Sequence, residues 1–159
     1  MTKKLILLLM LSLYLKAHAV THTKFTFKDQ EKAKEIIKEI ALETNTNESL
    51  LLAICQNESS LDKGAVGDDK SSHGLCQVKR TTMEEAEYFG HIKQLYDPVI
   101  NVIIASDHLR KCYNYFHHIN LAIACYNRGI RGLNRYIRKN SSWAVDNLSY
   151  VIKVRSLIE

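Results

Sequence analysis

Apolar residues recur at intervals of three and four along most of the chain, which is the spacing of one face of an α-helix. Thr26 and Asp29 form a capping box after a polar lead, so we expect a first helix to begin there. A polar break at 44–47 then opens a second apolar helix, from Glu48 to about Ser59. The apolar positions of the first helix are Ala33, Ile36, Ile37, Ile40 and Ala41.

Residues 61–79 interrupt this pattern and hold half of the six glycines, which is typical of an irregular loop. A loop of this length in a compact domain is usually functional or disordered. A short helix is expected next, from about Thr82 to near Gly90, with Thr81 as its N-cap and Glu84 in the capping-box position. Two apolar residues of the loop, Leu75 and Val78, indicate that it is ordered and packed.

Asp97 and the single proline predict the next helix, from Pro98 to about Tyr115, because proline after an aspartate cap suits the first helical position. Residues 121–126 make another apolar helix that stops around Gly129. The tail 142–158 is helical in spacing and should close the domain. The expected buried residues of the 98–115 helix are Val99, Val102, Ile103, Leu109 and Cys112. The apolar residues at helical spacing in the tail are Trp143, Leu148, Val151, Ile152 and Val154.

The pattern predicts an all-α fold, or an α fold with a minimal strand element, in a single domain. Only Thr23 to Phe27 alternates in the manner of a strand. The chain has 159 residues, of which 46% are hydrophobic and 25% charged, which excludes disorder and leaves no room for two independent domains.

The N-terminus has the three zones of a secretory signal peptide: Lys3 and Lys4, the apolar run Leu5–Leu15, and the small residues of Ala17-His18-Ala19. We expect cleavage after Ala19 and a mature domain of residues 20–159. A retained anchor is the alternative, although eleven residues at ~1.5 Å each span only about half of a bilayer core. The mature protein is then exported, periplasmic or extracellular, with no transmembrane anchor.

Cleavage lowers the formal charge from +5 to +2, because the signal peptide holds three lysines and no acid. The remaining basic residues are mixed with acids, so we expect no nucleic-acid partner. Four cysteines at 55, 76, 112 and 125 stay in the exported part, where disulfides or buried thiols are favoured over a metal site. Their pairing is open. His117 and His118 point about 100° apart on a helix and suit a solvated pair better than a metal site.

Glu58 is the candidate catalytic residue, because it ends an apolar helix just before the long loop. Burial there would raise the pKa of its carboxyl group, and a neutral carboxylic acid can protonate a leaving oxygen. The alternative is an ordinary solvated glutamate at a helix end.

The pieces Glu58-Ser59, Gly74-Leu75-Cys76-Gln77 and Ala124-Cys125-Tyr126-Asn127, with the late Tyr150, resemble in order and spacing the motifs of soluble-type lytic transglycosylases. These share the goose-type lysozyme fold. The resemblance covers about Asn47 to Val154. Softer matches are Ala65, Asp97-Pro98 with Asn101, and Gly129.

The resemblance implies a lysozyme-like helical domain with a substrate groove that cleaves the β-1,4 bond between N-acetylmuramic acid and N-acetylglucosamine in peptidoglycan. No water is used, and a 1,6-anhydro end forms. Glu58 would carry both proton transfers, and no cofactor or metal is implied. The residues implied in substrate binding are Ser59, Gly74, Leu75, Gln77, Tyr126, Asn127 and Tyr150.

Each of these residues also has a structural interpretation, such as a helix terminator for Ser59 or a core aromatic for Tyr126. Within the motifs we expect the Tyr126 hydroxyl to hold Glu58, and Gly74 to let ligand or backbone approach closely, so that its substitution impairs binding more than stability. Cys76 and Cys125 depart from the family pattern and are either apolar fillers or bonded, to each other or to Cys55 and Cys112.

The partners implied are peptidoglycan glycan strands and, for so small an enzyme, a secretion, conjugation or phage assembly; we expect a monomer. Two alternatives remain: a hydrolase of the same superfamily and a catalytically silent wall-binding or assembly protein. Hydrolysis would need a second carboxylate ~6.5–9.5 Å from Glu58. Asp62, Asp68 and Asp69 are the candidates for it.

Overall fold

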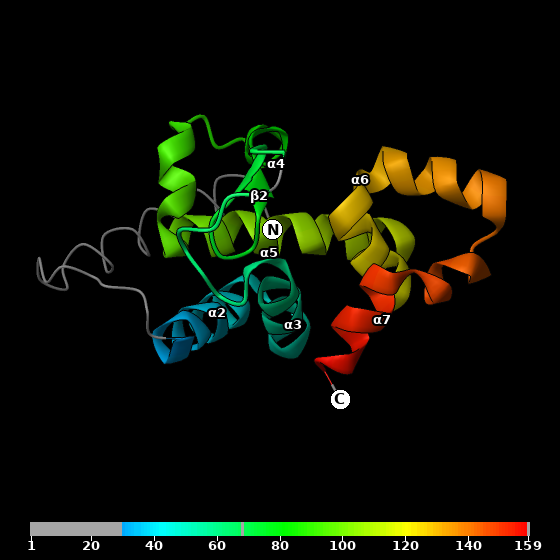
Figure 1. Cartoon of the computed structure of the whole chain (residues 1–159), viewed down its shortest axis with the longest axis horizontal. Coiled ribbons are helices and arrows are strands. Elements are labelled where there is room, and N and C mark those ends of the chain that lie inside the picture. The colour runs from blue at the N-terminus through cyan, green and yellow to red at the C-terminus, as the bar shows by residue number, and fades with distance from the viewer. Residues whose placement is uncertain (1–29, 68, 159) are drawn as a thin grey trace, which may run out of the picture.

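The computed structural model describes residues 30–67 and 69–158. The signal peptide, the Thr23–Phe27 segment and the capping box at Thr26 and Asp29 lie outside them. The elements run in the order α2 (Gln30–Thr44), α3 (Glu48–Ser59), β1 (Ser72–His73), β2 (Val78–Lys79), α4 (Arg80–Glu85), η1 (Ile92–Tyr96), α5 (Pro98–Phe116), α6 (Ile119–Asn140), η2 (Trp143–Asn147) and α7 (Ser149–Ser156) (Figure 1).

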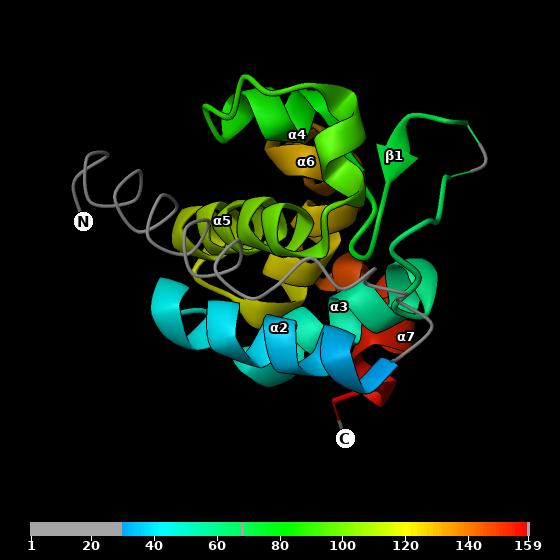
Figure 2. The same cartoon turned by 90° about the vertical axis from the view of Figure 1, so that its left-hand side faces the viewer.

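Helix α5 is the central element of the fold. It crosses the middle of the molecule, with α2 and α3 on one side and α4 on the other (Figure 2). Its residues 100–106 are all buried, so the helix contacts neighbours around its whole circumference. As the sequence predicts, the Asp97 side chain caps α5 by accepting from the backbone N–H groups of Val99 and Ile100, and Pro98 is its first residue.

The first two expected helices are confirmed. Helix α2 buries Ala33, Ile37, Ile40 and Ala41, and α3 begins after Asn47, whose side chain accepts from the backbone N–H of Leu50. Helix α3 ends at Ser59 because Ser60 takes a left-handed conformation, with φ 54°. This end positions Glu58 next to the loop.

The expected start and end of the short helix are wrong. Helix α4 begins at Arg80 directly after β2, and its N-cap is Lys79 without a side-chain cap. Glu84 does not close a capping box on Thr81, since its carboxylate accepts from Arg80 Nε at 2.9 Å. The helix ends at Glu85 and not near Gly90.

Helix α6 is interrupted at Gly129, as expected, but it does not end there. Gly129 has φ 68° and ψ 161°, and a second helical stretch continues from it to Asn140. The tail is also divided, since Leu148 is extended between η2 and α7. Two apolar residues of the tail are exposed, Trp143 at 80% and Ile152 at 54%, whereas Val151 and Val154 are buried.

The 61–79 loop is ordered and contains the small strand element. Strands β1 and β2 pair antiparallel, with Ser72 opposite Lys79 and His73 opposite Val78, and Val66 forms an isolated bridge with His73. The described chain is thus helical with one small hairpin, which confirms the predicted fold class.

The four cysteines form two disulfides, Cys55–Cys76 and Cys112–Cys125. This excludes the Cys76–Cys125 pairing and the free-thiol alternative. Disulfides persist in oxidising compartments, so the pairing indicates a protein outside the reducing cytosol. Among the described residues, no helix is both long and apolar enough to cross a membrane.

Candidate active site

Glu58 lies on the last turn of α3 and is half-buried. Burial raises the pKa of its carboxyl group, and this effect is opposed by a hydrogen bond from Tyr150 and by the positive charge of Lys79. The direction agrees with the sequence prediction. A carboxyl group in this environment keeps its proton to a higher pH than an exposed glutamate does.

Tyr150, at the start of α7, holds the carboxyl group of Glu58. Its hydroxyl donates to Glu58 Oε1 at 2.5 Å. Burial and the nearby Glu58 charge raise the pKa of Tyr150, so this hydroxyl remains a donor throughout the working pH range. Asn57, adjacent to Glu58 in α3, lowers the pKa of Tyr150 and so opposes part of this effect.

Tyr126 does not hold Glu58, and that expectation is wrong. Its hydroxyl donates instead to the carbonyl oxygen of Cys76 at 2.8 Å. Burial and the charge of Glu58 both raise the pKa of Tyr126, so the acid acts on this hydroxyl without a hydrogen bond between them. Tyr126 therefore supports the loop beside the acid, and Tyr150 supports the acid itself.

The turn at residues 74–77 is fixed by Asn101 of α5, which is fully buried. Asn101 Oδ1 accepts from the backbone N–H of Cys76 at 2.9 Å, and Nδ2 donates to the carbonyls of His73 and Leu95, each at 2.8 Å. One buried amide thus satisfies three backbone groups of two segments, which secures the position of the turn next to α3.

This turn requires glycine at position 74 because the backbone is left-handed there and because there is no room for a Cβ atom. Its φ is +77°, and a Cβ at this residue would lie 2.2 Å from the Leu95 carbonyl oxygen and 2.5 Å from Asn101 Nδ2. The close approach is to backbone and to a buried amide, and not to an open groove. The surroundings of Gly74 therefore favour a loss of stability on substitution, in addition to the loss of binding expected from the sequence.

Ser59 and Gln77 connect the loop to its neighbours. Ser59 Oγ donates to the carbonyl oxygen of Leu75 at 2.6 Å, which joins the end of α3 to the turn. Gln77 Nε2 donates to the carbonyls of Gly74 and Ala65, and its Oε1 accepts from Ser72 Oγ at 2.9 Å. Both side chains therefore have structural partners in the hairpin or the turn.

The Cys55–Cys76 disulfide adds a covalent link at the same place. Cys55 lies one turn before Glu58 in α3, and Cys76 lies in the turn that Ser59 and Tyr126 contact. Leu75 is fully buried, so its side chain belongs to the core. Asn127 is exposed on α6 beside Tyr126.

The structure therefore brings together Glu58, Ser59, the 74–77 turn, Tyr126 and Tyr150, which are separated by up to 92 residues in sequence. Asn57 and Asn101 complete the assembly. From the sequence, Asn101 was only part of a softer motif match, and Asn57 was not singled out. A buried asparagine inside an apolar helical run was the signal for the structural role of Asn101.

The aspartates proposed as a second carboxylate lie in turns. Asp62 Oδ1 accepts from the backbone N–H of Gly64 at 2.8 Å, and Asp69 accepts from the backbone N–H and hydroxyl of Ser71. The Ser71 hydrogen bonds lower the pKa of Asp69. Neither aspartate is among the groups that shift the pKa of Glu58. Asp68 lies outside the described residues.

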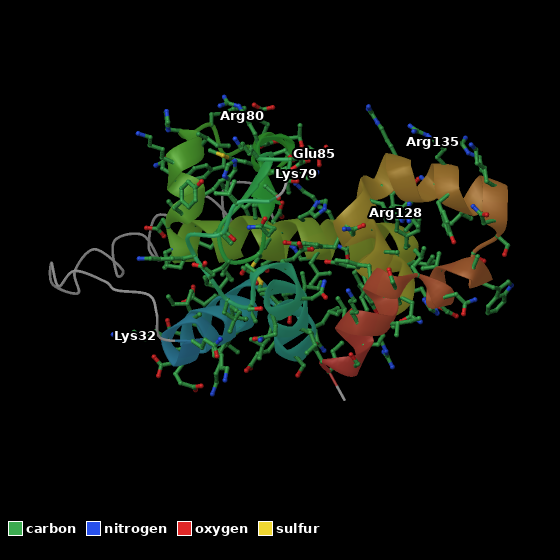
Figure 3. The ribbon with its side chains drawn as sticks, viewed as in Figure 1. Lys32, Lys79, Arg80, Glu85, Arg128 and Arg135 are labelled. Atoms are coloured by element: carbon green, nitrogen blue, oxygen red, sulfur yellow. A yellow bond between two sulfur atoms is a disulfide. The ribbon has the colours of Figure 1, made fainter. Side chains whose placement is uncertain are left out.

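A hollow of about 520 Å³ opens beside the hairpin. Lys79 and Arg80, both labelled in Figure 3, line this hollow. The positive charge of Lys79 also lowers the pKa of Glu58. Lys79 Nζ lies 3.8 Å from an Asp69 carboxylate oxygen, so part of its charge is compensated. The remaining lining residues are Lys70, Ser71, His73, Thr81 and Ile92.

The residues described here include no group of three or more His, Cys, Asp or Glu side chains placed to hold a metal ion. His117 is the left-handed C-cap of α5, and His118 precedes α6. Both are exposed, as predicted for a solvated pair.

The chain is similar to the invasion protein IagB from two strains of Salmonella typhimurium and from Salmonella typhi. The identity is 31% over 100 residues in each case, which cover 60% of this chain. The aligned region spans about 62% of the length of these curated relatives.

Residues 35–148 match the family model described as the transglycosylase SLT domain. The matched region holds Glu58, the 74–77 turn, Asn101 and Tyr126, while Tyr150 lies just beyond it. The match covers well over half of the chain, and its motifs meet around the half-buried Glu58. This protein therefore belongs to the transglycosylase SLT domain family.

Proposed function

We propose that this protein is an exported peptidoglycan lytic transglycosylase with Glu58 as its single acid and base. It cleaves the β-1,4 bond between N-acetylmuramic acid and N-acetylglucosamine without water. The observation that carries the proposal is the half-buried carboxyl group of Glu58, with a raised pKa and a hydrogen bond from Tyr150, in a chain of this family.

In the first step, protonated Glu58 donates its proton to the glycosidic oxygen as the bond from that oxygen to C1 of muramic acid breaks. Burial of Glu58 supports this role, because it favours the neutral acid. The substrate's own N-acetyl oxygen stabilises C1, a recognised exception to the two-carboxylate scheme of glycosidases.

In the second step, the Glu58 carboxylate takes the proton of the C6 hydroxyl as that oxygen attacks C1. The product is a 1,6-anhydro ring, and Glu58 is protonated again. Tyr150 supports this step, since its hydroxyl donates to a Glu58 carboxylate oxygen and so fixes the side chain while it is charged. Lys79 contributes a positive charge that also favours the carboxylate.

The substrate-binding residues expected from the resemblance are Ser59, Gly74, Leu75, Gln77, Tyr126, Asn127 and Tyr150, and we propose that they shape the site in two different ways. Their contacts divide them. Exposed Asn127 and the aromatic rings of Tyr126 and Tyr150 are suited to touch sugar, whereas Ser59, Gly74, Leu75 and Gln77 act by holding the turn. Peptidoglycan glycan strands are the partner, and the protein works as a monomer without a cofactor.

The alternative of a water-using hydrolase needs a second carboxylate near Glu58. The turn roles of Asp62 and Asp69 favour the transglycosylase over this alternative. The two reactions are distinguished by mass spectrometry of digested wall, because an anhydro end is lighter than a reducing end by the mass of water.

The deciding experiment compares purified wall digested by the wild type and by Glu58→Gln. Glu and Gln have nearly the same shape, so the variant should keep its fold and lose roughly 10²-fold or more in rate. We expect anhydro ends from the wild type alone. Unchanged lysis by Glu58→Gln would refute the assignment, and no lysis by the folded wild type would favour a silent wall-binding protein.

The name of the relatives, invasion protein, favours a local task in a protein-export process over general wall turnover. A small wall-cleaving domain suits the opening of a path for a secretion apparatus. The two disulfides support a periplasmic or extracellular location.

A further inference from the structure

The expectation that basic residues are evenly mixed with acids is wrong for one segment of the chain. Residues 127–145 contain no aspartate or glutamate. Residues 30–67 and 69–158 contain 17 basic and 14 acidic residues, which gives a formal net charge of +3. Five of the basic residues lie in the 127–145 segment, so the other described residues carry a net charge of −2. The five are Arg128, Arg131, Arg135, Arg138 and Lys139.

Three of these arginines share one face of the second half of α6. At 100° per residue, Arg131, Arg135 and Arg138 lie within about 60° of one another around the helix. All three are exposed, and Leu133, on the opposite face, is fully buried. Figure 3 shows Arg128 and Arg135 on this helix, with Arg135 projecting outward. We call Arg131, Arg135 and Arg138 the arginine stripe.

The stripe carries uncompensated charge. Within residues 30–67 and 69–158, the ion pairs of the structure involve other basic residues, and none uses an arginine of the stripe. Arg128, just before the stripe, rests over the Tyr136 ring at 4.8 Å from its centroid. Exposed guanidinium groups without a carboxylate are free to bind one from another molecule, often with two parallel hydrogen bonds.

The stripe lies on the same helix as one residue of the candidate site. Tyr126, which supports the 74–77 turn beside Glu58, lies on α6 only five residues before Arg131. From Gly129 the helical stretch runs to Asn140, about 16 Å at 1.5 Å per residue. The same element thus carries a residue of the candidate site before the break at Gly129 and the stripe after it.

We propose that the arginine stripe binds the carboxylates of the peptide stems of peptidoglycan and so holds the wall next to Glu58. This rests on the proposed function and names a second, anionic part of the same substrate. No apolar residue of residues 130–140 falls within the 60° sector of the three arginines, which favours an ionic partner over insertion into lipid.

The test measures co-sedimentation of the protein with purified, insoluble wall, in a Glu58→Gln background that prevents digestion. The stripe variant is Arg131→Gln, Arg135→Gln and Arg138→Gln. The matched control removes three charges from α2, with Lys32→Gln, Lys34→Gln and Lys38→Gln. Figure 3 shows Lys32 at the other end of the molecule. Circular dichroism verifies that both variants are folded.

We expect the stripe variant to bind wall about tenfold more weakly than its parent, and the control less than twofold. The difference should vanish near 1 M salt, where the Debye length is ~3 Å. Wall whose carboxylates have been converted to amides should bind the parent as weakly as native wall binds the stripe variant. Equal losses in the two variants, or undiminished binding to amidated wall, would overturn the proposal.

Anionic lipid vesicles form the last arm. Stripe-dependent binding to vesicles, without stripe-dependent binding to wall, would replace the proposal with a membrane partner. Because binding is measured without catalysis, its outcome is independent of the test of the proposed function. Absence of anhydro ends from wild-type digests would remove the enzyme assignment while a stripe effect on wall binding would stand.

Discussion

The two disulfides connect different kinds of segment. Cys112–Cys125 joins α5 to α6, two long helices that already pack against each other. Cys55–Cys76 joins α3 to a turn with no regular structure of its own, and Cys55 lies three residues before Glu58. The first reinforces a contact that the core makes anyway. The second fixes a turn whose position depends on individual hydrogen bonds.

The local contacts around each disulfide support this difference. The turn at 74–77 accepts hydrogen bonds from Ser59 and Tyr126 and donates one to Asn101, and these three side chains come from different helices. Helices α5 and α6 both bury apolar side chains, such as Leu109 and Ile123, and two side-chain hydrogen bonds, from His108 and Asn134, also join them. Apolar packing tolerates small shifts, whereas a hydrogen-bonded turn beside a catalytic acid depends on exact geometry.

The largest effect is expected from Gly74→Ala, which disturbs the turn directly. The new Cβ would meet the Leu95 carbonyl oxygen and Asn101, and φ +77° is strained for alanine. We expect a loss of about 4 kcal/mol in unfolding free energy. Gly129→Ala is the matched control: φ is +68° but nothing lies within 4 Å, so strain alone should cost about 2 kcal/mol. Urea unfolding of both variants measures the difference, and equal losses would show that the clash is relieved.

The second prediction compares the disulfides themselves. Cys55→Ala with Cys76→Ala and Cys112→Ala with Cys125→Ala open loops of similar size, with sequence separations of 21 and 13. The chain-entropy contributions of the two bonds differ by only about 0.4 kcal/mol. Both variants should therefore lose similar stability.

Wall-lysis activity should separate the two variants. At a temperature where both are folded, we expect about a tenfold lower kcat/KM without Cys55–Cys76, because misplacement of the turn disturbs the surroundings of Glu58. Loss of Cys112–Cys125 should change kcat/KM less than twofold. Equal losses of activity would contradict the distinction between the two bonds.

The sequence was sufficient for the helices whose ends carry chemical signals. Asp97 with Pro98 and the polar break before Glu48 marked true helix starts. Thr81 carried the same type of signal and was wrong, because β2 leads directly into α4 and Arg80 binds Glu84. A cap motif competes with tertiary pairing, and the sequence does not show which one wins.

The site was predictable in its members but not in its contacts. Motif order brought Glu58, the 74–77 turn, Tyr126 and Tyr150 together, yet it could not assign the two tyrosine hydroxyls. Which hydroxyl reaches Glu58 depends on the path of α7 after the extended Leu148. The cysteine pairing was open for the same reason, since it depends on distances between helices and not on spacing in the chain.

The third prediction concerns Tyr150→Phe, which removes the hydroxyl from Glu58 and leaves the turn intact. That hydrogen bond lowers the pKa of Glu58, so its removal should raise the pKa further. The acid form needed for cleavage is present below this pKa and is lost as pH rises through it. The alkaline limb of the pH–rate profile should therefore move to higher pH. We also expect about tenfold lower kcat, because the carboxylate is less well positioned. An unmoved limb would mean that Tyr150 has only a packing role.

The smallest effect is expected from Tyr126→Phe, which sharpens the comparison by loosening the turn without breaking its disulfide. The variant loses one hydrogen bond, to the Cys76 carbonyl oxygen, at a cost of about 1–2 kcal/mol. Because Cys55–Cys76 and Asn101 still hold the turn, kcat/KM should fall only a few-fold. The alkaline limb should stay in place, since the hydroxyl does not bond Glu58. Thermal unfolding and a pH–rate profile measure both quantities. A shift of the limb as large as that of Tyr150→Phe would mean that Tyr126 positions the acid after all.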